Sequence, residues 1–138
     1  MLLFVYDTLR NGFRANALLK RCQCQATLQT SKDYSLAHLD NAVTLTHLAS
    51  DQGVKGELYY VKDRQALDAH YGAAQFERCY ITLENGDQAT AYVAKEMHRA
   101  KVLPSGDYAD HVLDCWHQFW EPTLLDVIRW ATAKDWAT

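Results

Sequence analysis

Residues 54–61, which read VKGELYYV, form the most regular strand pattern in the sequence. Alternate residues of an extended chain point to opposite faces. The even-numbered residues therefore share one face, and the odd-numbered residues, among them Glu57, share the other. This alternation predicts a strand, around which the other elements of the chain are arranged.

Further strands are predicted on both sides of this one. Short apolar or β-branched runs precede it at residues 2–5, 22–28, 34–39 and 42–48. After it, residues 78–84 and 87–95 flank the dipeptide Asn85-Gly86. Because Asn-Gly favours the two-residue type I′ turn, this segment predicts a β-hairpin.

Helices are predicted between the strands and in the last thirty residues. One starts at Asn11-Gly12 and runs to residue 20, and another lies between Asp63 as N-cap and Gly72. Two more form an extension over about residues 105–136, the second with Pro122 at its first position. Many short strands with few helices predict a single α+β domain over residues 1–138, with a small sheet curled towards a barrel.

Composition excludes several classes of protein. The 138 residues include 14 Lys and Arg against 17 Asp and Glu, with no basic run, so we expect no nucleic-acid partner. No apolar stretch approaches the roughly 18 residues of a membrane span, so we expect no membrane partner. The opening MLLFVY lacks a basic region and meets Asp7 at once, which predicts a cytoplasmic protein rather than a secreted one.

The cysteines and histidines do not predict a metal site. The four Cys form no C-x-x-C pair, so we expect reduced, structural thiols. Asp107, His111 and Cys115 recur every four residues, but they form one helix stripe rather than a closed ligand set. We therefore expect neither a metal nor an organic cofactor.

The C-terminal extension is rich in tryptophan. All four Trp of the chain lie there, at positions 116, 120, 130 and 136. An exposed surface of this kind would aggregate, so something must cover it. Two interpretations stay open: both helices cover the sheet of their own chain, or they form the interface of a homodimer.

Four segments together resemble the gamma-glutamylcyclotransferase-like proteins. The segments are FVYDTLRNG at 4–12, VKGELY at 54–59, LDAHYG at 67–72 and LPSGDY at 103–108. They are similar to that family's first strand with its Tyr-Gly-Ser/Thr-Leu loop, its Val-x-Gly-Glu-Leu-Tyr strand, its Leu-Asp-x-x-Glu-Gly helix end and its late Ser-Gly-Asp-aromatic segment. The order and spacing agree over residues 2–20 and 54–108.

The resemblance implies a fold, a pocket and a reaction. The fold is a small mixed β-barrel with flanking helices. The pocket lies at the turn after the first strand, where Tyr6, Asp7, Thr8, Leu9 and Arg10 would bind a small, gamma-glutamyl-like ligand. In the family reaction the α-amine of a gamma-glutamyl group attacks its own γ-carbonyl, which gives 5-oxoproline and a free amine. The loop N–H groups bind an anion, a Glu moves the proton, and no cofactor is needed.

This sequence departs from the family pattern at two positions. Asp7 stands where the family has Gly; an Asp tolerates left-handed backbone, and its carboxylate either bonds locally or pairs with Arg10. Tyr71 stands at the position of the catalytic Glu. A phenol with an ordinary pKa of about 10 is a poor base at neutral pH, so we expect Tyr71 to be a pocket-wall aromatic.

Three hypotheses follow. In the first, the protein keeps a small-molecule pocket but lacks ordinary cyclotransferase activity. In the second, it is an active enzyme of this type with another base: Glu57 if its side chain points inward, or His70, although His70 is turned away from Tyr71 along the helix. In the third, it is a homo-oligomeric interaction module that assembles through the Trp-rich helices.

Overall fold

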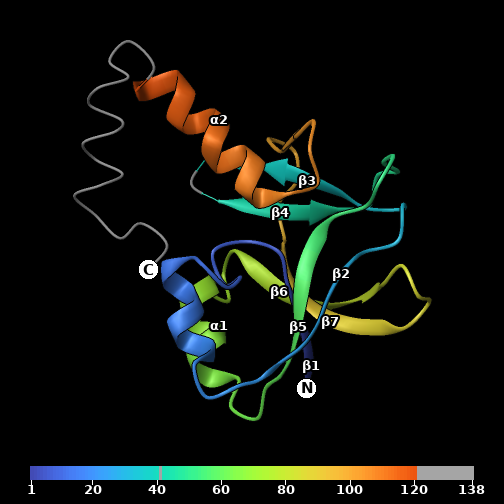
Figure 1. The fold of residues 1–138 in the computed structure, drawn as a ribbon, viewed down its shortest axis with the longest axis vertical. Coiled ribbons are helices and arrows are strands. Elements are labelled where there is room, and N and C mark those ends of the chain that lie inside the picture. Colours follow the sequence, from blue (N-terminus) through green and yellow to red (C-terminus); the bar gives the residue numbers. More distant parts are fainter. Residues whose placement is uncertain (41, 121–138) are drawn as a thin grey trace.

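The computed structural model describes residues 1–40 and 42–120 (Figure 1). Its elements in chain order are β1 (Leu2–Val5), the 3-10 helix η1 (Arg14–Leu19), β2 (Cys24–Gln29), β3 (Ser35–His38), β4 (Val43–Thr46), β5 (Lys55–Tyr60), α1 (Gln65–Tyr71), β6 (Phe76–Thr82), β7 (Gln88–Ala94), β8 (Lys101–Val102) and α2 (Tyr108–Trp120). The strands form a five-stranded sheet in the order β2-β5-β1-β7-β6 and a three-stranded sheet in the order β4-β3-β8.

Strand β1 lies in the middle of the larger sheet. It pairs antiparallel with β5, with Phe4 opposite Leu58 and Val5 opposite Glu57, and it pairs parallel with β7 through Leu3 and Thr90. A strand with neighbours on both sides and cover on both faces needs a continuous apolar sequence, which LLFV provides.

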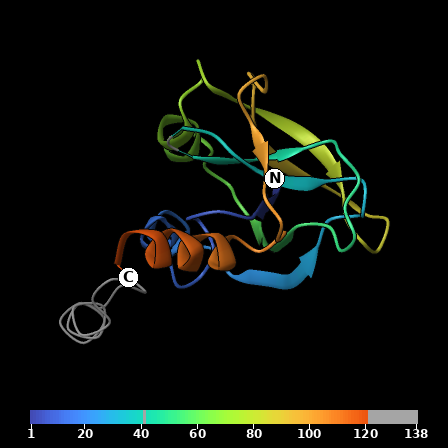
Figure 2. The ribbon, with the colours of Figure 1, turned by 90° about the horizontal axis from the view of Figure 1, so that it is seen from above.

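The side chains of β1 divide the core into two clusters. Phe4 points into the cluster that the smaller sheet helps to form, with Leu36 and Leu45. Leu3 points into the other, which includes Leu67 of α1. Figure 1 shows η1 and α1 together on one flank, and Figure 2 shows α2 on the same side as η1.

A side-chain bond joins the two sheets. The hydroxyl of Thr44 on β4, which is fully buried, accepts a hydrogen bond of 2.9 Å from the N–H of Ala94 at the end of β7.

The predicted α+β class is confirmed, with one refinement: the strands of the described residues form two sheets and no closed barrel.

The hairpin is present, but its turn is not type I′. Gly86 has a φ of +88°, whereas none of the described non-glycine residues has a positive φ. A type I′ turn needs a positive φ at both central residues, so Asn85 rules it out. Instead, Leu83 accepts from Gly86 N–H at 2.9 Å and donates to the carbonyl of Asp87 at 2.8 Å, which makes a three-residue loop with glycine at the left-handed position.

The predicted helices differ from the observed ones in their ends. The first is a 3-10 helix that starts at Arg14, because the backbone from Asn11 to Phe13 is used in turns. The second ends as predicted at Gly72, with a φ of +82°, but its N-cap is Arg64 and not Asp63, whose side chain accepts the N–H of Gln65. The predicted helix from Pro122 lies outside the described residues. None of the helices in the described ranges is long and apolar enough to cross a bilayer.

Candidate active site at the turn after the first strand

The turn after β1 is closed by its own backbone and by the side chain of Asp7. Arg10 N–H donates to the carbonyl of Asp7 at 3.0 Å, and Leu9 N–H donates to Asp7 Oδ1 at 3.1 Å. Asp7 therefore bonds locally, as one of the sequence interpretations predicted. The left-handed backbone that we allowed for Asp7 is not adopted, because no described residue other than glycine has a positive φ.

The carboxyl group of Asp7 lies against the phenol of Tyr71. The Tyr71 hydroxyl donates to Oδ2 at 2.8 Å, with Oδ1 at 3.0 Å. Helix α1 ends at Tyr71. The ring of Tyr71 stacks on that of Tyr92, with the ring centroids 4.3 Å apart, and also contacts the ring of Phe76. Asp7 is only 6% exposed. The two positions that depart from the family pattern are thus in direct contact.

Burial controls the ionisation of this pair. Loss of water raises the pKa of Asp7, although the hydrogen bonds from Leu9 N–H and Tyr71 oppose the change. Burial and the nearby Asp7 charge raise the pKa of Tyr71 well above its ordinary value. Tyr71 therefore keeps its proton at neutral pH and donates a hydrogen bond to Asp7.

Replacing Asp7 with Asn should stabilise the fold at neutral pH. A carboxyl whose pKa is raised on folding binds its proton more tightly in the folded chain, so wild-type stability falls as pH rises from the ordinary carboxyl pKa to the raised one. Asn carries no charge and should remove that fall. We expect denaturant unfolding to give Asp7→Asn and wild type the same free energy of unfolding at about pH 4. At about pH 8 the variant should be the more stable of the two. A constant difference across this range would contradict the assignment.

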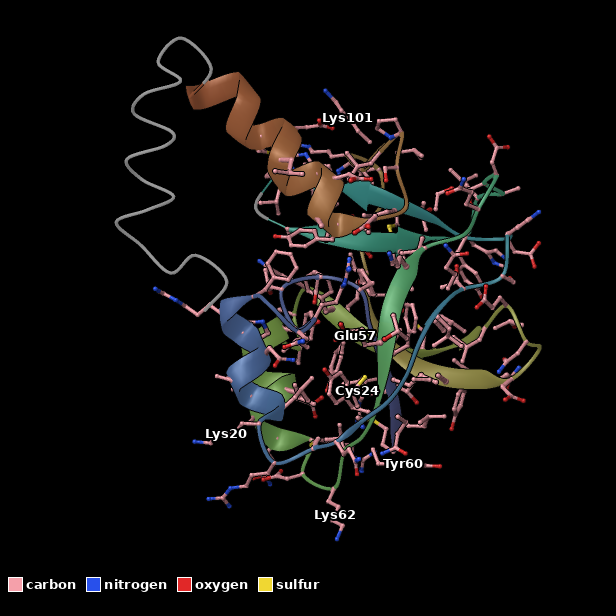
Figure 3. The ribbon with its side chains drawn as sticks, viewed as in Figure 1. Lys20, Cys24, Glu57, Tyr60, Lys62 and Lys101 are labelled. Carbon is pink, nitrogen blue, oxygen red and sulfur yellow. The ribbon has the colours of Figure 1, made fainter. Side chains whose placement is uncertain are left out.

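Glu57 holds the turn from the neighbouring strand. Its side chain is 9% exposed and lies on β5 facing the turn (Figure 3). Glu57 Oε1 accepts the N–H of Asn11 at 2.8 Å and the hydroxyl of Tyr59 at 2.9 Å. Asn16 adds a bond of 2.7 Å from its side chain to the carbonyl of Leu9. These contacts give Glu57 a structural task, and its role as an alternative base stays a prediction.

Arg10 pairs with a residue from the far end of the described chain. Its Nη1 lies 2.7 Å from Asp107 Oδ1, which also accepts the N–H of Ala109 at 2.9 Å. Burial opposes ionisation of Asp107, but the hydrogen bonds from Arg10 and Ala109 N–H, with the charges of Arg10 and Lys55, together keep the Asp107 pKa below its usual range. The pairing of Arg10 with Asp7 that we considered is therefore wrong. Asp107 was visible in the sequence as part of a motif, but nothing there pointed to a partner 97 positions away.

The remaining candidate residues lie around this centre. Leu9 is fully buried, and Thr8 is partly buried. The hydroxyl of Tyr6 donates to the carbonyl of Tyr92 at 2.5 Å, and burial raises the pKa of Tyr6. His70 is exposed, with its ring centroid 5.1 Å from that of Tyr71.

The structure brings the turn, Asp7 and Tyr71 together, but none of four cavities in the structure opens at the turn itself. Tyr71 lines one of about 260 Å³ beside β6 and β7. Three others, of about 340, 500 and 590 Å³, are lined by other elements. Residues 6–10 line none of these four, so the small-molecule pocket expected at the turn stays a prediction.

Comparison with solved structures gives several proteins of the same fold. An uncharacterized protein from Pyrococcus horikoshii superposes with a TM-score of 0.65 at 20% identity, over 86% of this chain and 98% of that one. An AIG2-like protein from Mus musculus gives 0.58 at 21% identity, over 78% and 86%. Kluyveromyces lactis allophanate hydrolase gives 0.71 at 15% identity, and there the match covers 83% of this chain but 21% of that one.

Sequence comparison gives the family directly. No curated protein matches the sequence. The profile of the family described as gamma-glutamyl cyclotransferase, AIG2-like, matches residues 3–110, which include β1 from its second residue, strands β2 to β8, η1, α1 and the start of α2. This chain therefore belongs to the gamma-glutamyl cyclotransferase, AIG2-like family.

Proposed function

We propose that this protein keeps the family fold but does not carry out the ordinary cyclotransferase reaction. The observation that carries the proposal is the contact between Asp7 and Tyr71. By its resemblance to the family, the chain has Tyr71 at the position of the catalytic Glu, and Asp7 replaces a glycine. The carboxyl of Asp7 then fills space that the glycine would leave to a ligand.

The anion-binding groups of the turn support the same proposal. A cyclotransferase uses loop N–H groups to bind the substrate carboxylate or the developing oxyanion. Here the N–H groups of Leu9 and Asn11 donate to the protein's own carboxylates, Asp7 and Glu57, and that of Arg10 donates to a backbone carbonyl. A substrate would have to displace these bonds in a buried site, where an unmade hydrogen bond costs about 1–3 kcal/mol.

A second candidate is an active enzyme in which Asp7 is the base. One observation favours it: burial raises the Asp7 pKa towards the range that suits proton transfer at neutral pH. Against it, both Asp7 oxygens already accept hydrogen bonds, and the side chain is 6% exposed.

One assay separates the two candidates. The purified protein is incubated with gamma-glutamyl-alanine, gamma-glutamyl-ε-lysine or glutathione, and 5-oxoproline is measured by mass spectrometry. We expect no protein-dependent product from wild type and a product from the double variant Asp7→Gly/Tyr71→Glu, which restores the family pattern. The control Asp7→Gly/Tyr71→Gln has the same space but no base, and should give none.

Two results would overturn the proposal. Product from wild type would show an active enzyme, and its loss in Asp7→Asn would identify Asp7 as the base. A double variant that folds, binds a gamma-glutamyl compound and still gives no product would show that the missing base is not the cause.

The homo-oligomer hypothesis stays a prediction, because its Trp side chains lie outside the part of the chain whose side chains are described.

A further inference from the structure

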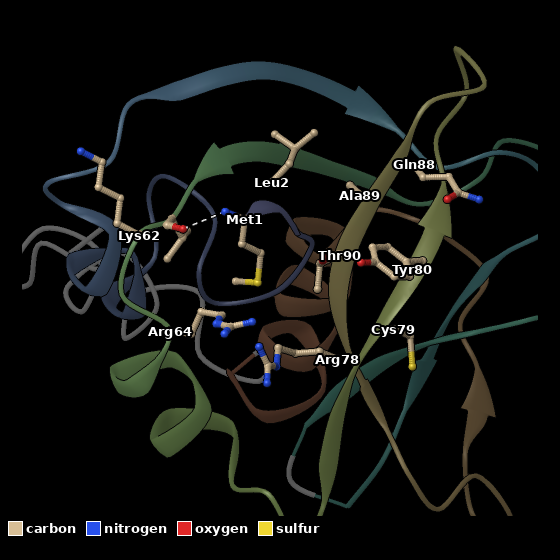
Figure 4. A pocket seen from close by; sticks show the side chains of 11 residues that line it. Met1, Leu2, Lys62, Arg64, Arg78, Cys79, Tyr80, Gln88, Ala89 and Thr90 are labelled. Carbon is tan, nitrogen blue, oxygen red and sulfur yellow. Dashed lines mark hydrogen bonds between the residues drawn. The ribbon is translucent and has the colours of Figure 1, made fainter.

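A cavity of about 590 Å³ opens at the opposite end of β1 from the turn. Met1 and Leu2 form one wall, and the first residues of β7 with the middle of β6 form the other (Figure 4). The segment between β5 and α1 closes the third side. The volume lies within the range of about 300–1,000 Å³ that is usual for small-molecule sites.

The charged residues that line this cavity are all cationic: Lys62, Arg64 and Arg78. Each of the three other cavities described above includes at least one acidic side chain, such as Asp68 or Asp40. A purely cationic lining is notable in a chain whose net charge is −3, because chance would place acidic residues there more often than basic ones.

The two arginines face each other across the cavity. Figure 4 shows their guanidinium groups pointing toward one another below Met1, with Lys62 farther out at the rim. Arg64 directly precedes α1, and Arg78 lies on β6. Two like charges so arranged repel each other, and an anion between them would turn the repulsion into two attractions.

The side chain of Arg78 is also held by an acidic residue of α1. Its Nε lies 3.6 Å from Asp68 Oδ1, and the same carboxylate oxygen accepts the hydroxyl of Tyr92. Within the described residues, no ion pair involves Arg64 or Lys62. The cavity therefore holds more positive charge than its surroundings neutralise.

We propose that this cavity binds a small organic anion through phosphate or carboxylate groups. A planar guanidinium donates two parallel hydrogen bonds to either group, and Arg64 and Arg78 supply two such donors. Thr90 and Gln88 add neutral polar groups to the wall, and Tyr80, which is 79% exposed, offers an aromatic face to the organic part of the ligand. The site is separate from the turn at Asp7, so it does not depend on the proposed loss of cyclotransferase activity.

Calorimetric titration of the full chain at an ionic strength of about 0.1 M, where the Debye length is about 10 Å, tests this site, with pyrophosphate as the phosphate probe and citrate as the carboxylate probe. We expect Arg64→Gln and Arg78→Gln each to weaken binding of the better probe about 10-fold or more, because a hydrogen bond to a charged group is worth about 1.5–3 kcal/mol. Preference for pyrophosphate identifies a phosphate site and preference for citrate a carboxylate site.

The matched control is Lys101→Gln. It removes one positive charge from β8, which Figure 3 shows at the other end of the molecule from Lys62. We expect its affinity to stay within about 2-fold of wild type, since exposed charges farther away than the Debye length are screened. Equal weakening by Lys101→Gln would mean diffuse attraction and no site. Unchanged affinity in both arginine variants, with their fold verified by circular dichroism, would also overturn the proposal, as would no binding of either probe to wild type.

Discussion

Tyr71→Glu with Asp7 left in place is expected to be much less stable than Tyr71→Gln at neutral pH. Both substitutions remove the same ring from its stack on Tyr92 and the same hydroxyl from Asp7. They differ in charge alone, because Glu sets a second carboxylate beside a buried one. Two charges 5–6 Å apart in an environment with an effective dielectric constant of about 20 repel by about 3 kcal/mol.

The pH dependence of this difference identifies its cause. Below about pH 4 both carboxyls are protonated, so the two variants should unfold at the same denaturant concentration. At about pH 7 the free energy of unfolding of the Glu variant should be about 2–3 kcal/mol lower than that of the Gln variant. If one of the two carboxyls keeps its proton, the difference is smaller. Adding Asp7→Gly should shrink the difference to the cost of burying the Glu carboxylate alone. An undiminished difference without Asp7 would mean that the repulsion does not come from Asp7.

Gly56→Ala is expected to be the most damaging single substitution in the larger sheet. A Cβ atom at this position of β5 would overlap both the ring of Phe4 and the carbonyl oxygen of Val5. Both belong to β1, which pairs with β5 along its whole length, so neither gives way without a shift of the strand. Overpacking of this kind costs about 3 kcal/mol, measured as the loss of unfolding free energy in denaturant.

Gly86→Ala is the matched control for this prediction. It also adds one methyl group, but no atom lies within 4 Å of the added Cβ. Its cost comes from the backbone, since φ is +88°, and should be about 1–2 kcal/mol. If the Gly56 variant is no less stable than the Gly86 variant, β1 and β5 are not as closely packed as the structure shows.

The elements that could be predicted from the sequence are those with local signals. The regular pattern of residues 54–61 predicted β5, although both faces of the strand are buried and its burial does not alternate. Gly72 predicted the end of α1 because only glycine readily adopts its positive φ. The hairpin turn was wrong because Asn-Gly fits two loop geometries, and the pairing of Thr82 with Gln88 selects the longer one.

The candidate site depends on contacts that no local pattern contains. The sequence singled out Asp7 and Tyr71 as two separate departures from the family, but they are 64 positions apart and their contact needs the packed fold. The sequence left open which way Glu57 faces, and its bond to Asn11 follows from where the turn crosses β5. The second sheet was also missed, because the residues of β3 and β4 do not say which strands they pair with and β8 is only two residues long.

The central position of β1 has a consequence for how the chain folds. One neighbour of this strand, β5, lies about fifty positions along the chain, and the other, β7, lies more than eighty positions along, as the bond between Tyr6 and Tyr92 across 86 positions shows. During synthesis the apolar LLFV segment must remain unpaired on its second edge until β7 leaves the ribosome. Closing such long loops is slow, so we infer that this domain folds late and gradually, and that chaperones have time to bind it.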